Sequence, residues 1–355
     1  MKRSFALRTQ RIPFRRQRAV IVGLGPIGLE VARLVLAQPE VFQLAGVVDC
    51  APRLAGRALG DVLGRHAPPG RVLEAPPAQR SGEGLAFLTT TSSIRSVTKT
   101  IEALLAAGYH IVSSTEELSY PMLREPHLAA RLDRAARRAR RCVVGSGINP
   151  GFAMDVWPLV LASNMQTLHA VHVTRVVDAS QRREPLQRKV GAGLTRREFE
   201  TLARAGRIGH VGLVESGAHL AAALGWSLDS LRENLTAKLA TRHIRTASLD
   251  VRPGQVCGIH HRVVGSEGRR RRVTLDLQMY LGADDPRDEV VLEGQPPIRC
   301  VVPGGFHGDR TTASQLLSAA LRIRGMPPGL HLPSDLPTPR RSARPLHLSF
   351  ATSSR

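Results

Sequence analysis

Residues 18–33 read Arg-Ala-Val-Ile-Val-Gly-Leu-Gly-Pro-Ile-Gly-Leu-Glu-Val-Ala-Arg, and this stretch decides the fold. Its first apolar residues, two of them valines, predict a buried strand, and the apolar spacing from Pro26 onward predicts a helix. Between strand and helix, Gly23, Gly25 and Gly28 follow the spacing G-x-G-x-x-G. A strand, a glycine turn and a helix N-terminus in this order form a site for the pyrophosphate of a dinucleotide.

An acidic residue at the end of the next predicted strand supports this interpretation. Residues 43–49 end in Asp49, which lies 21 residues beyond Gly28. A carboxylate at this distance is placed to accept hydrogen bonds from the adenosine ribose, although a solvated Asp at a turn is the simpler alternative. Arg53 follows closely and suits a 2′-phosphate. We therefore expect NAD or NADP as the cofactor, without a choice between them.

Strands alternate with helices as far as residue 150, which predicts a parallel sheet covered on both faces. Beyond residue 151 the predicted strands follow one another more directly. The expected fold is α/β, with an N-terminal doubly wound Rossmann domain, a second α+β domain and a C-terminal helix that returns to the first. The expected segments are a basic extension (1–18), an NAD(P)-binding domain (19–150), a substrate and dimerisation domain (151–310), a helix packed on the first domain (311–330) and a tail (331–355).

Composition limits the classes of function. The formal net charge is +21, but only 4% of the residues are aromatic, so few stacking platforms for nucleic acid bases are available. We expect a solvated basic surface and no specific nucleic acid partner. No apolar run approaches the length of a membrane span, and the four scattered cysteines suit reduced thiols in the cytoplasm.

Parallel sheets bind ligands beyond the carboxyl ends of their strands. One such end carries the hydroxyl-rich turn Thr89-Thr-Thr-Ser-Ser93, which offers Thr90, Thr91, Ser92 and Ser93 to a phosphate or carboxamide. Another carries Ser114-Thr-Glu-Glu-Leu-Ser-Tyr-Pro121. A buried carboxylate there can exchange protons with an amine or water. The alternative role for either glutamate is to stabilise a helix N-terminus.

The glycine-rich stretch 145–157 follows a third strand end. It contains Asn149, and its Phe152, Met154 and Trp157 are candidates for the wall of an apolar pocket. Packing between domains would explain these side chains equally well. His260 lies in a predicted strand of the second domain, where a structural role is the default for a histidine. The histidines show no metal-ligand spacing, so no metal site is expected.

Taken together, these motifs resemble those of the 2,4-diaminopentanoate dehydrogenases and the related native amine dehydrogenases, a dihydrodipicolinate reductase-like group. The resemblance runs from about residue 20 to 337 and rests on five motifs in order: the glycine turn, Thr-Thr-Thr-Ser-Ser, Glu-Glu-Leu-Ser-Tyr-Pro, Gly-Ile-Asn-Pro-Gly-Phe-Ala-Met-Asp and a late Pro-Gly-Leu…Asp-Leu-Pro. It implies NAD(P)-dependent oxidative deamination of a primary amine to a carbonyl plus ammonia, and the reverse reductive amination.

The resemblance also implies roles for individual residues. It assigns the catalytic acid/base to Glu116. It assigns the substrate pocket to Asn149, Phe152 and Trp157, together with His260 and Thr312. It also implies a homodimer. The complete set of expected cofactor-binding residues is Gly23, Gly25, Pro26, Ile27, Gly28, Asp49, Arg53, Thr90, Thr91, Ser92, Ser93 and Asn149; the substrate set is Phe152, Met154, Trp157, His260 and Thr312.

Two other functions stay open from the sequence. A dihydrodipicolinate-type reductase would need clustered basic residues for two carboxylates, and residues 145–151 hold none. A nucleotide-sensing DNA-binding protein would use the arginines instead. The identity of the amine or ketone is also open. If the substrate carries a carboxylate, the candidate anchors are Arg175, Arg182, Arg183 and Arg188.

Overall fold

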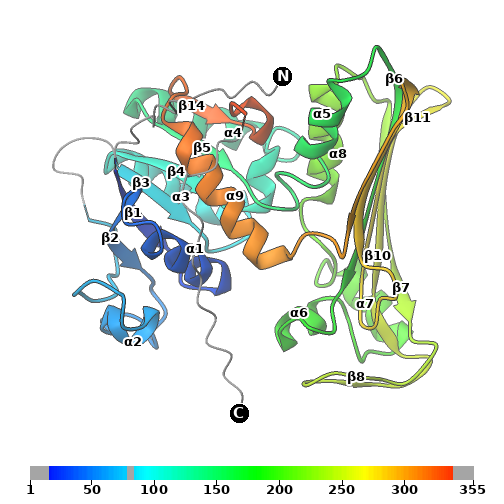
Figure 1. Cartoon of the computed structure of the whole chain (residues 1–355), viewed down its shortest axis with the longest axis horizontal. Coiled ribbons are helices and arrows are strands. Elements are labelled where there is room, and N and C mark those ends of the chain that lie inside the picture. The colour runs from blue at the N-terminus through cyan, green and yellow to red at the C-terminus, as the bar shows by residue number, and fades with distance from the viewer. Residues whose placement is uncertain (1–15, 78–83, 339–355) are drawn as a thin grey trace, which may run out of the picture.

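Two six-stranded sheets organise the chain (Figure 1). The structure is a computed structural model that describes residues 16–77 and 84–338. One sheet lies among helices on both sides. The other stands apart, with helices between it and the first sheet.

The first sheet is parallel, with the order β14-β5-β4-β3-β1-β2. Its strands are β1 (Gln17–Val22), β2 (Phe42–Val48), β3 (Gly84–Leu88), β4 (Tyr109–Ser113), β5 (Cys142–Gly145) and β14 (Gly329–His331). Its helices are α1 (Pro26–Leu36), α2 (Leu59–Leu63), α3 (Ile94–Ala106), the 3₁₀ turn η1 (Glu116–Ser119), α4 (Pro126–Ala139) and α9 (Gly308–Ile323).

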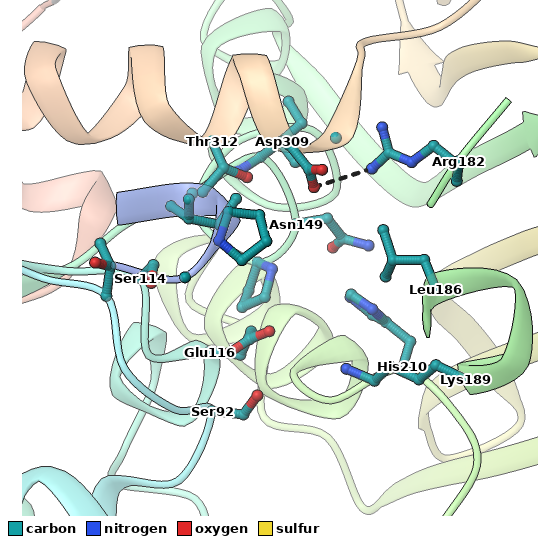
Figure 2. Close-up of a pocket in the computed structure, with 18 of the residues that line it drawn as sticks. Ser92, Ser114, Glu116, Asn149, Arg182, Leu186, Lys189, His210, Asp309 and Thr312 are labelled. Atoms are coloured by element: carbon teal, nitrogen blue, oxygen red, sulfur yellow. Dashed lines mark hydrogen bonds and ion pairs between the residues drawn. The ribbon is translucent and has the colours of Figure 1, made fainter. Parts of the chain in front are cut away.

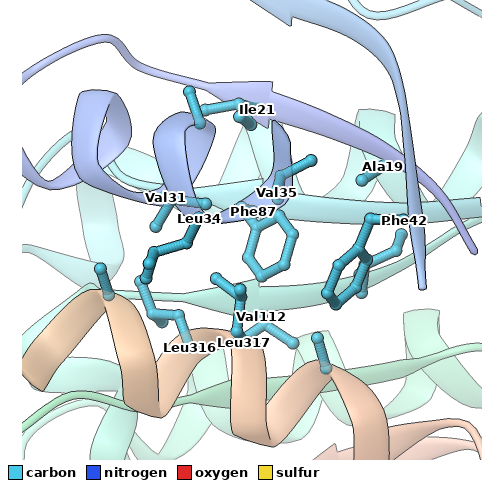
Figure 3. Packing of buried hydrophobic residues seen from close by; sticks show 14 of the residues in the cluster. Ala19, Ile21, Val31, Leu34, Val35, Phe42, Phe87, Val112, Leu316 and Leu317 are labelled. Carbon is cyan, nitrogen blue, oxygen red and sulfur yellow. The ribbon is translucent and has the colours of Figure 1, made fainter. Parts of the chain in front are cut away.

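The apolar core lies on both faces of this sheet. On one face, Val31 and Leu34 of α1 and Leu316 and Leu317 of α9 pack over Phe87 (Figure 3). On the other face, α3 and α4 bury a second apolar cluster against the same strands. The last long helix thus completes the first layer, because its apolar side chains fill the space beside α1.

The second sheet is mixed, with the order β13-β12-β6-β11-β10-β7. Only the β6–β11 pair is parallel. Its strands are β6 (Thr167–Asp178), β7 (Ser230–Leu239), β10 (Val256–Glu267), β11 (Arg270–Tyr280), β12 (Arg287–Gln295) and β13 (Ile298–Pro303), and β8 (Ile244–Arg245) and β9 (Asp250–Val251) form a small separate pair. The associated helices are α5 (Val156–Ala162), α6 (Glu184–Lys189), α7 (Arg196–Arg204) and α8 (Leu213–Ala223); a final 3₁₀ turn, η2 (Pro333–Asp335), follows β14.

The predicted fold class is confirmed, including the return of the C-terminal helix to the first layer. Three elements differ from what the sequence pattern predicts. The pattern predicts a helix over 53–64, but only the short α2 forms there. It predicts a helix from residue 151, but α5 begins at Val156, because the Asp155 side chain accepts a hydrogen bond from the Val156 N–H and starts the helix there. It predicts one strand over 244–251, which is split into β8 and β9 around a turn.

The segments expected as a basic extension (1–18) and a tail (331–355) are partly folded in the described residues. Strand β1 begins at Gln17, inside the expected basic extension, and Leu336 of the expected tail is only 7% exposed. Residues 1–15 and 339–355 lie outside the described residues. Within the described ranges, no helix is both long and apolar enough to cross a bilayer.

Candidate functional site

The glycine turn leaves an open space at the N-terminus of α1. A Cβ at Gly28 would lie 1.9 Å from the Gly23 carbonyl oxygen, and one at Gly23, where φ is +96°, would lie 2.8 Å from the Thr90 side chain. These two glycines therefore allow strand and helix to pack closely. At Gly25 a Cβ would meet nothing within 4 Å. This is the arrangement in which a phosphate can approach backbone N–H groups.

Asp49 lies at the end of β2 and is bonded to the glycine turn. Its Oδ2 accepts a hydrogen bond from the Leu24 N–H at 2.7 Å, and its Oδ1 accepts one from the Ala51 N–H at 2.8 Å. Each carboxylate oxygen keeps a second acceptor position. Arg53 is exposed in the turn that follows.

A pocket of about 320 Å³ extends from this turn into the space between the two sheets. The first layer contributes the glycine turn, the hydroxyl-rich turn after β3, the segment after β4 and the start of α9. The second layer contributes β6, β11, α6 and the loop before α8. Of the predicted residues, Gly25, Pro26, Ile27, Thr90, Thr91, Ser92, Glu116, Asn149 and Thr312 line it.

Glu116 and Glu117 have different surroundings at the start of η1. Glu117 Oε2 accepts a hydrogen bond from the Ile94 N–H at 2.9 Å, at the N-terminus of α3. Glu116 instead lines the pocket beside Ser92 (Figure 2). Gly212 helps to make room for it, since a Cβ at Gly212 would lie 2.6 Å from the Pro150 ring and 3.2 Å from the Glu116 Cβ.

The environment of Glu116 favours its protonated form. Burial raises the pKa of this carboxyl above its ordinary value. Hydrogen bonds from its own backbone N–H and from Ser92, together with the positive charge of Lys189, lower the pKa and offset part of that rise. A carboxyl with a raised pKa that also lines a pocket is a candidate for general acid/base chemistry.

Asn149 brings a side-chain amide to the pocket. Among the described residues, neither its Oδ1 nor its Nδ2 has a hydrogen-bond partner, and both atoms are buried. Buried amides are nearly always hydrogen-bonded, so a ligand with both a donor and an acceptor fits here. Thr312, at the start of α9, closes the same end of the pocket, where its hydroxyl accepts a hydrogen bond from the Ile148 N–H at 3.4 Å.

The wall opposite Glu116 contains residues that the sequence analysis did not assign to the site. Figure 2 shows His210 and Lys189 facing Glu116 and Ser92 across the pocket. Burial lowers the pKa of His210 to about 3, helped by the nearby positive charges of Lys189 and Arg175. Its Nε2 is buried and has no partner among the described residues. The one signal in the sequence is the glycine-rich segment around it, 206–212, in which all three glycines have positive φ.

The four arginines considered as anchors for a substrate carboxylate all contact carboxylates of the chain itself, and one of them lies outside the pocket. Arg175 is buried and donates to both oxygens of Asp288 at 2.6 Å. Arg182 lines the pocket and pairs with Asp309 at 3.2 Å, while Arg183, also at the pocket, lies 3.5 Å from the same carboxylate. Arg188 pairs with Glu184 on α6 and does not line the pocket.

The expected aromatic wall lies in the core of the second layer instead. Phe152 and Trp157 both pack edge-to-face against Phe306, and Met154 is fully buried in the same cluster. None of the three lines the pocket. Their role in the described structure is packing, because the turn before α5 directs them toward the second sheet.

His260 is likewise away from the pocket. It pairs in register with Gln278, and its ring bonds to Asp276 at 2.9 Å. Side chains alternate between the two faces of a strand, and Leu277 and Met279 are the β11 residues that line the pocket. His260 therefore points to the opposite face. Ser93, the N-cap residue of α3, and Arg53 do not line the pocket either.

Comparisons with known proteins agree with this architecture. A family model for the 2,4-diaminopentanoate dehydrogenase C-terminal domain matches residues 152–347. The chain is 28% identical to a 2,4-diaminopentanoate dehydrogenase of Acetoanaerobium sticklandii, covering 91% of this chain and 94% of that protein. It is 24% identical to an amine dehydrogenase of Streptomyces virginiae, covering 90% and 95%.

The solved structures share the fold. The structure of an amine dehydrogenase from Mycobacterium smegmatis aligns with a TM-score of 0.77 at 21% identity, covering 92% of this chain and 97% of that one. A scyllo-inositol dehydrogenase from Lactobacillus casei, solved with NAD(H) and scyllo-inositol, aligns with a TM-score of 0.51 at 14% identity, covering 86% of each chain.

Proposed function

The chain belongs to the 2,4-diaminopentanoate dehydrogenase family, and from this premise we propose that it is an NAD(P)-dependent amine dehydrogenase. It would convert a small primary amine to a carbonyl compound plus ammonia, and run the reverse reductive amination. The observation that carries the proposal is the position of Glu116, a carboxyl with a raised pKa in the pocket that begins at the glycine turn.

The residues of the first layer fit a nicotinamide dinucleotide. The open space at Gly25 suits the pyrophosphate, and Asp49 suits the adenosine ribose. The unpartnered amide of Asn149 matches a carboxamide, which has one donor and one acceptor group. When bound, the cofactor supplies the acceptor for the hydride that leaves the amine-bearing carbon, and the donor in the reverse direction.

Glu116 would move the protons of the reaction. Its carboxylate takes a proton from the substrate ammonium group, so that the nitrogen lone pair can assist loss of the hydride, and this proton passes to solvent. The free carboxylate then takes a proton from the water that attacks the iminium carbon and returns it to the nitrogen. As the carbonyl forms, ammonia leaves and takes up the remaining hydroxyl proton as ammonium. The raised pKa of Glu116 favours its return to the protonated form between these transfers.

The pocket is small and has mixed polarity. Its apolar wall includes Leu186, Leu277 and Met279, and its charged groups include Lys189 and Arg182. Such a site suits a short amine or carbonyl compound. The sequence relatives named as dehydrogenases favour this function over a dihydrodipicolinate-type reductase or a DNA-binding nucleotide sensor.

We also propose that the chain works as a cytoplasmic homodimer. In Figure 1, helices lie on one side of the second sheet, and no helix of the described residues lies on its outer side. That outer face carries polar side-chain contacts such as the hydrogen bond of His260 with Asp276 and offers a surface for a second copy. Size-exclusion chromatography with light scattering tests this: a mass of twice 38.5 kDa is expected, and a monomer at all concentrations would contradict it.

A substrate panel tests the function. Purified protein is mixed with short ketones and aldehydes, some carrying a carboxylate, together with ammonium and either NADH or NADPH. Loss of nicotinamide absorbance that requires both the carbonyl compound and ammonium is expected. Loss that requires the carbonyl compound but proceeds without ammonium would instead indicate an alcohol dehydrogenase, and no turnover across the panel would contradict the proposal.

A further inference from the structure

A second cavity, of about 470 Å³, adjoins the pocket and has no role in the chemistry described so far. The two share His210 and Lys189 as lining residues. The second cavity lies between Glu117 and Arg124 of the first layer and the loop before α8, with α8, β7 and β10 behind it. Its contents would therefore lie next to the reacting groups.

Three lining atoms of this cavity are buried and without a partner among the described residues. They are Glu215 Oε2, His261 Nδ1 and His210 Nε2. Glu215 and His261 are each only 2% exposed. An unsatisfied buried polar atom is costly, and three around one cavity indicate that it holds a polar ligand.

All three atoms are hydrogen-bond acceptors. Glu215 Oε1 accepts from Arg124 at 2.6 Å, which leaves Oε2 of the carboxylate free. The His261 Nε2 lies 2.7 Å from Glu233 Oε1; a carboxylate can only accept, so Nε2 carries the hydrogen, and in this tautomer of imidazole Nδ1 is an acceptor. His210 is neutral at physiological pH, and its ring hydrogen-bonds to the Asn149 backbone, which leaves Nε2 as an acceptor.

The charged side chains around the cavity balance one another. The carboxylates of Glu117, Glu215 and Glu233 face the cations of Arg124, Lys189 and Arg207. No group of three His, Cys, Asp or Glu side chains in the described ranges is arranged to hold a metal ion. The complement to three hydrogen-bond acceptors is a small group that carries only donors.

We propose that this cavity binds ammonium, held by Glu215, His261 and His210 beside the substrate pocket. Ammonium has four N–H donors and no acceptor, which matches the three free acceptors. The inference rests on the proposed function, in which ammonia is the product of deamination and the co-substrate of amination. His210 borders both cavities, so only its side chain would separate the bound ammonium from the pocket that holds Glu116.

Three variants separate this role from a general loss of structure. Glu215→Gln keeps the shape and an oxygen for Arg124 but turns the free acceptor into a donor. His261→Gln keeps a donor toward Glu233 and loses the acceptor at the Nδ1 position, whereas His261→Asn keeps that acceptor. The matched control is Glu289→Gln. It removes a carboxylate on β12 that is paired with Arg287 of the same strand and Arg299 of β13.

The first measurement is the KM for ammonium in reductive amination at saturating carbonyl compound and NAD(P)H. We expect it to rise on the order of tenfold or more in Glu215→Gln and His261→Gln. His261→Asn should recover most of this loss, and the control should match the wild type. The KM for the carbonyl compound should stay within twofold in every variant. An ammonium KM equal to wild type in both Gln variants would overturn the inference while leaving the proposed function standing.

The second measurement is the melting temperature, which needs no turnover. Ammonium chloride should raise the Tm of the wild type and of Glu289→Gln above the values in potassium or sodium chloride at equal ionic strength. Glu215→Gln should lose this difference. Equal effects of the three salts on the wild type would show that water or any monovalent cation can bind the free acceptor atoms of the cavity. That result would overturn the ammonium site. An ammonium-specific shift without any turnover would instead contradict the proposed function and leave the site intact.

Discussion

The carboxylates of Glu116 and Glu117 are adjacent in sequence but serve different parts of the molecule. Glu117 Oε2 accepts a hydrogen bond from the Ile94 N–H at 2.9 Å, whereas Glu116 faces the pocket beside Ser92. Glu117 thus accepts a hydrogen bond from one of the free N–H groups at the start of α3, and Glu116 is left available for chemistry. Geometry as well as resemblance therefore supports the proposal of Glu116 as the acid/base.

Removal of the Glu117 side chain should affect stability and spare the chemistry. We expect Glu117→Ala to lower the free energy of unfolding by about 1 kcal/mol, because α3 loses an acceptor for one of its first N–H groups. Glu117→Gln keeps an acceptor oxygen and should cost less. Denaturant unfolding measures the change, and a kcat within a few-fold of wild type is expected for both variants. If Glu117→Gln were inactive, the acid/base role would move to Glu117.

Asp49 should set the choice between the two cofactors. Asp49→Ala removes the carboxylate that would repel a 2′-phosphate and leaves Arg53 to attract it, so the ratio of kcat/KM for NADPH over NADH should rise. The variant should also lose stability on the order of 1–3 kcal/mol, since the Leu24 and Ala51 N–H groups lose their acceptor. Asp61→Ala, on the exposed surface of α2, is the matched control. An unchanged cofactor ratio in Asp49→Ala would exclude Asp49 as the ribose ligand.

The buried Arg175–Asp288 pair should be important for the stability of the second layer. The two side chains are 4% and 1% exposed. Asp288→Asn leaves the Arg175 cation without its counter-charge, and a loss of about 3–5 kcal/mol is expected. Glu30→Gln, which breaks the more exposed pair with Arg33, should cost no more than about 1 kcal/mol. Thermal denaturation compares the two variants, and Asp288→Asn should have the lower melting temperature. Equal melting temperatures would show that the buried pair is dispensable.

The ionised carboxylate of Glu116 should lower the free energy of unfolding at neutral pH. Its pKa is raised in the folded state, so the folded protein binds this proton more tightly than the unfolded chain does. Ionisation then destabilises the fold progressively as the pH rises through the folded-state pKa. Glu116→Gln removes that cost, so its Tm should exceed that of the wild type at neutral pH, and the difference should vanish below about pH 4. A difference in Tm that does not change with pH would contradict burial as the cause of the pKa shift.

The sequence was most informative where local chemistry fixes the backbone. The glycine turn, the run of strands and helices and the returning helix α9 were predicted because their apolar periodicity and glycine spacing are local signals. Strands β7 and β12 and helix α6 were not predicted. In β7 and β12, charged and polar residues interrupt the alternation of apolar side chains that predicts a strand. These strands are held instead by hydrogen bonds to neighbouring strands and by side-chain contacts such as Glu233 with His261 and Arg287 with Glu289.

The site was predictable on the first layer and much less so on the second. The strand-end rule placed Ser92, Glu116 and Asn149 at the pocket, because the carboxyl ends of parallel strands meet at one edge. Which side chains of the second layer reach the pocket depends on how that sheet faces the first. No local pattern encodes this, so Phe152 and Trp157 were assigned to the pocket and His210 was overlooked.

Steady-state kinetics of Glu116→Gln tests the central claim most directly. The variant keeps the size and hydrogen bonding of the side chain but cannot exchange a proton. We predict that kcat for reductive amination falls about 10²–10⁴-fold, with the affinity for NADH, measured by fluorescence titration, within a few-fold of wild type. A variant that keeps wild-type kcat would contradict the account, because Glu116 would then be a buried carboxyl with no part in the chemistry.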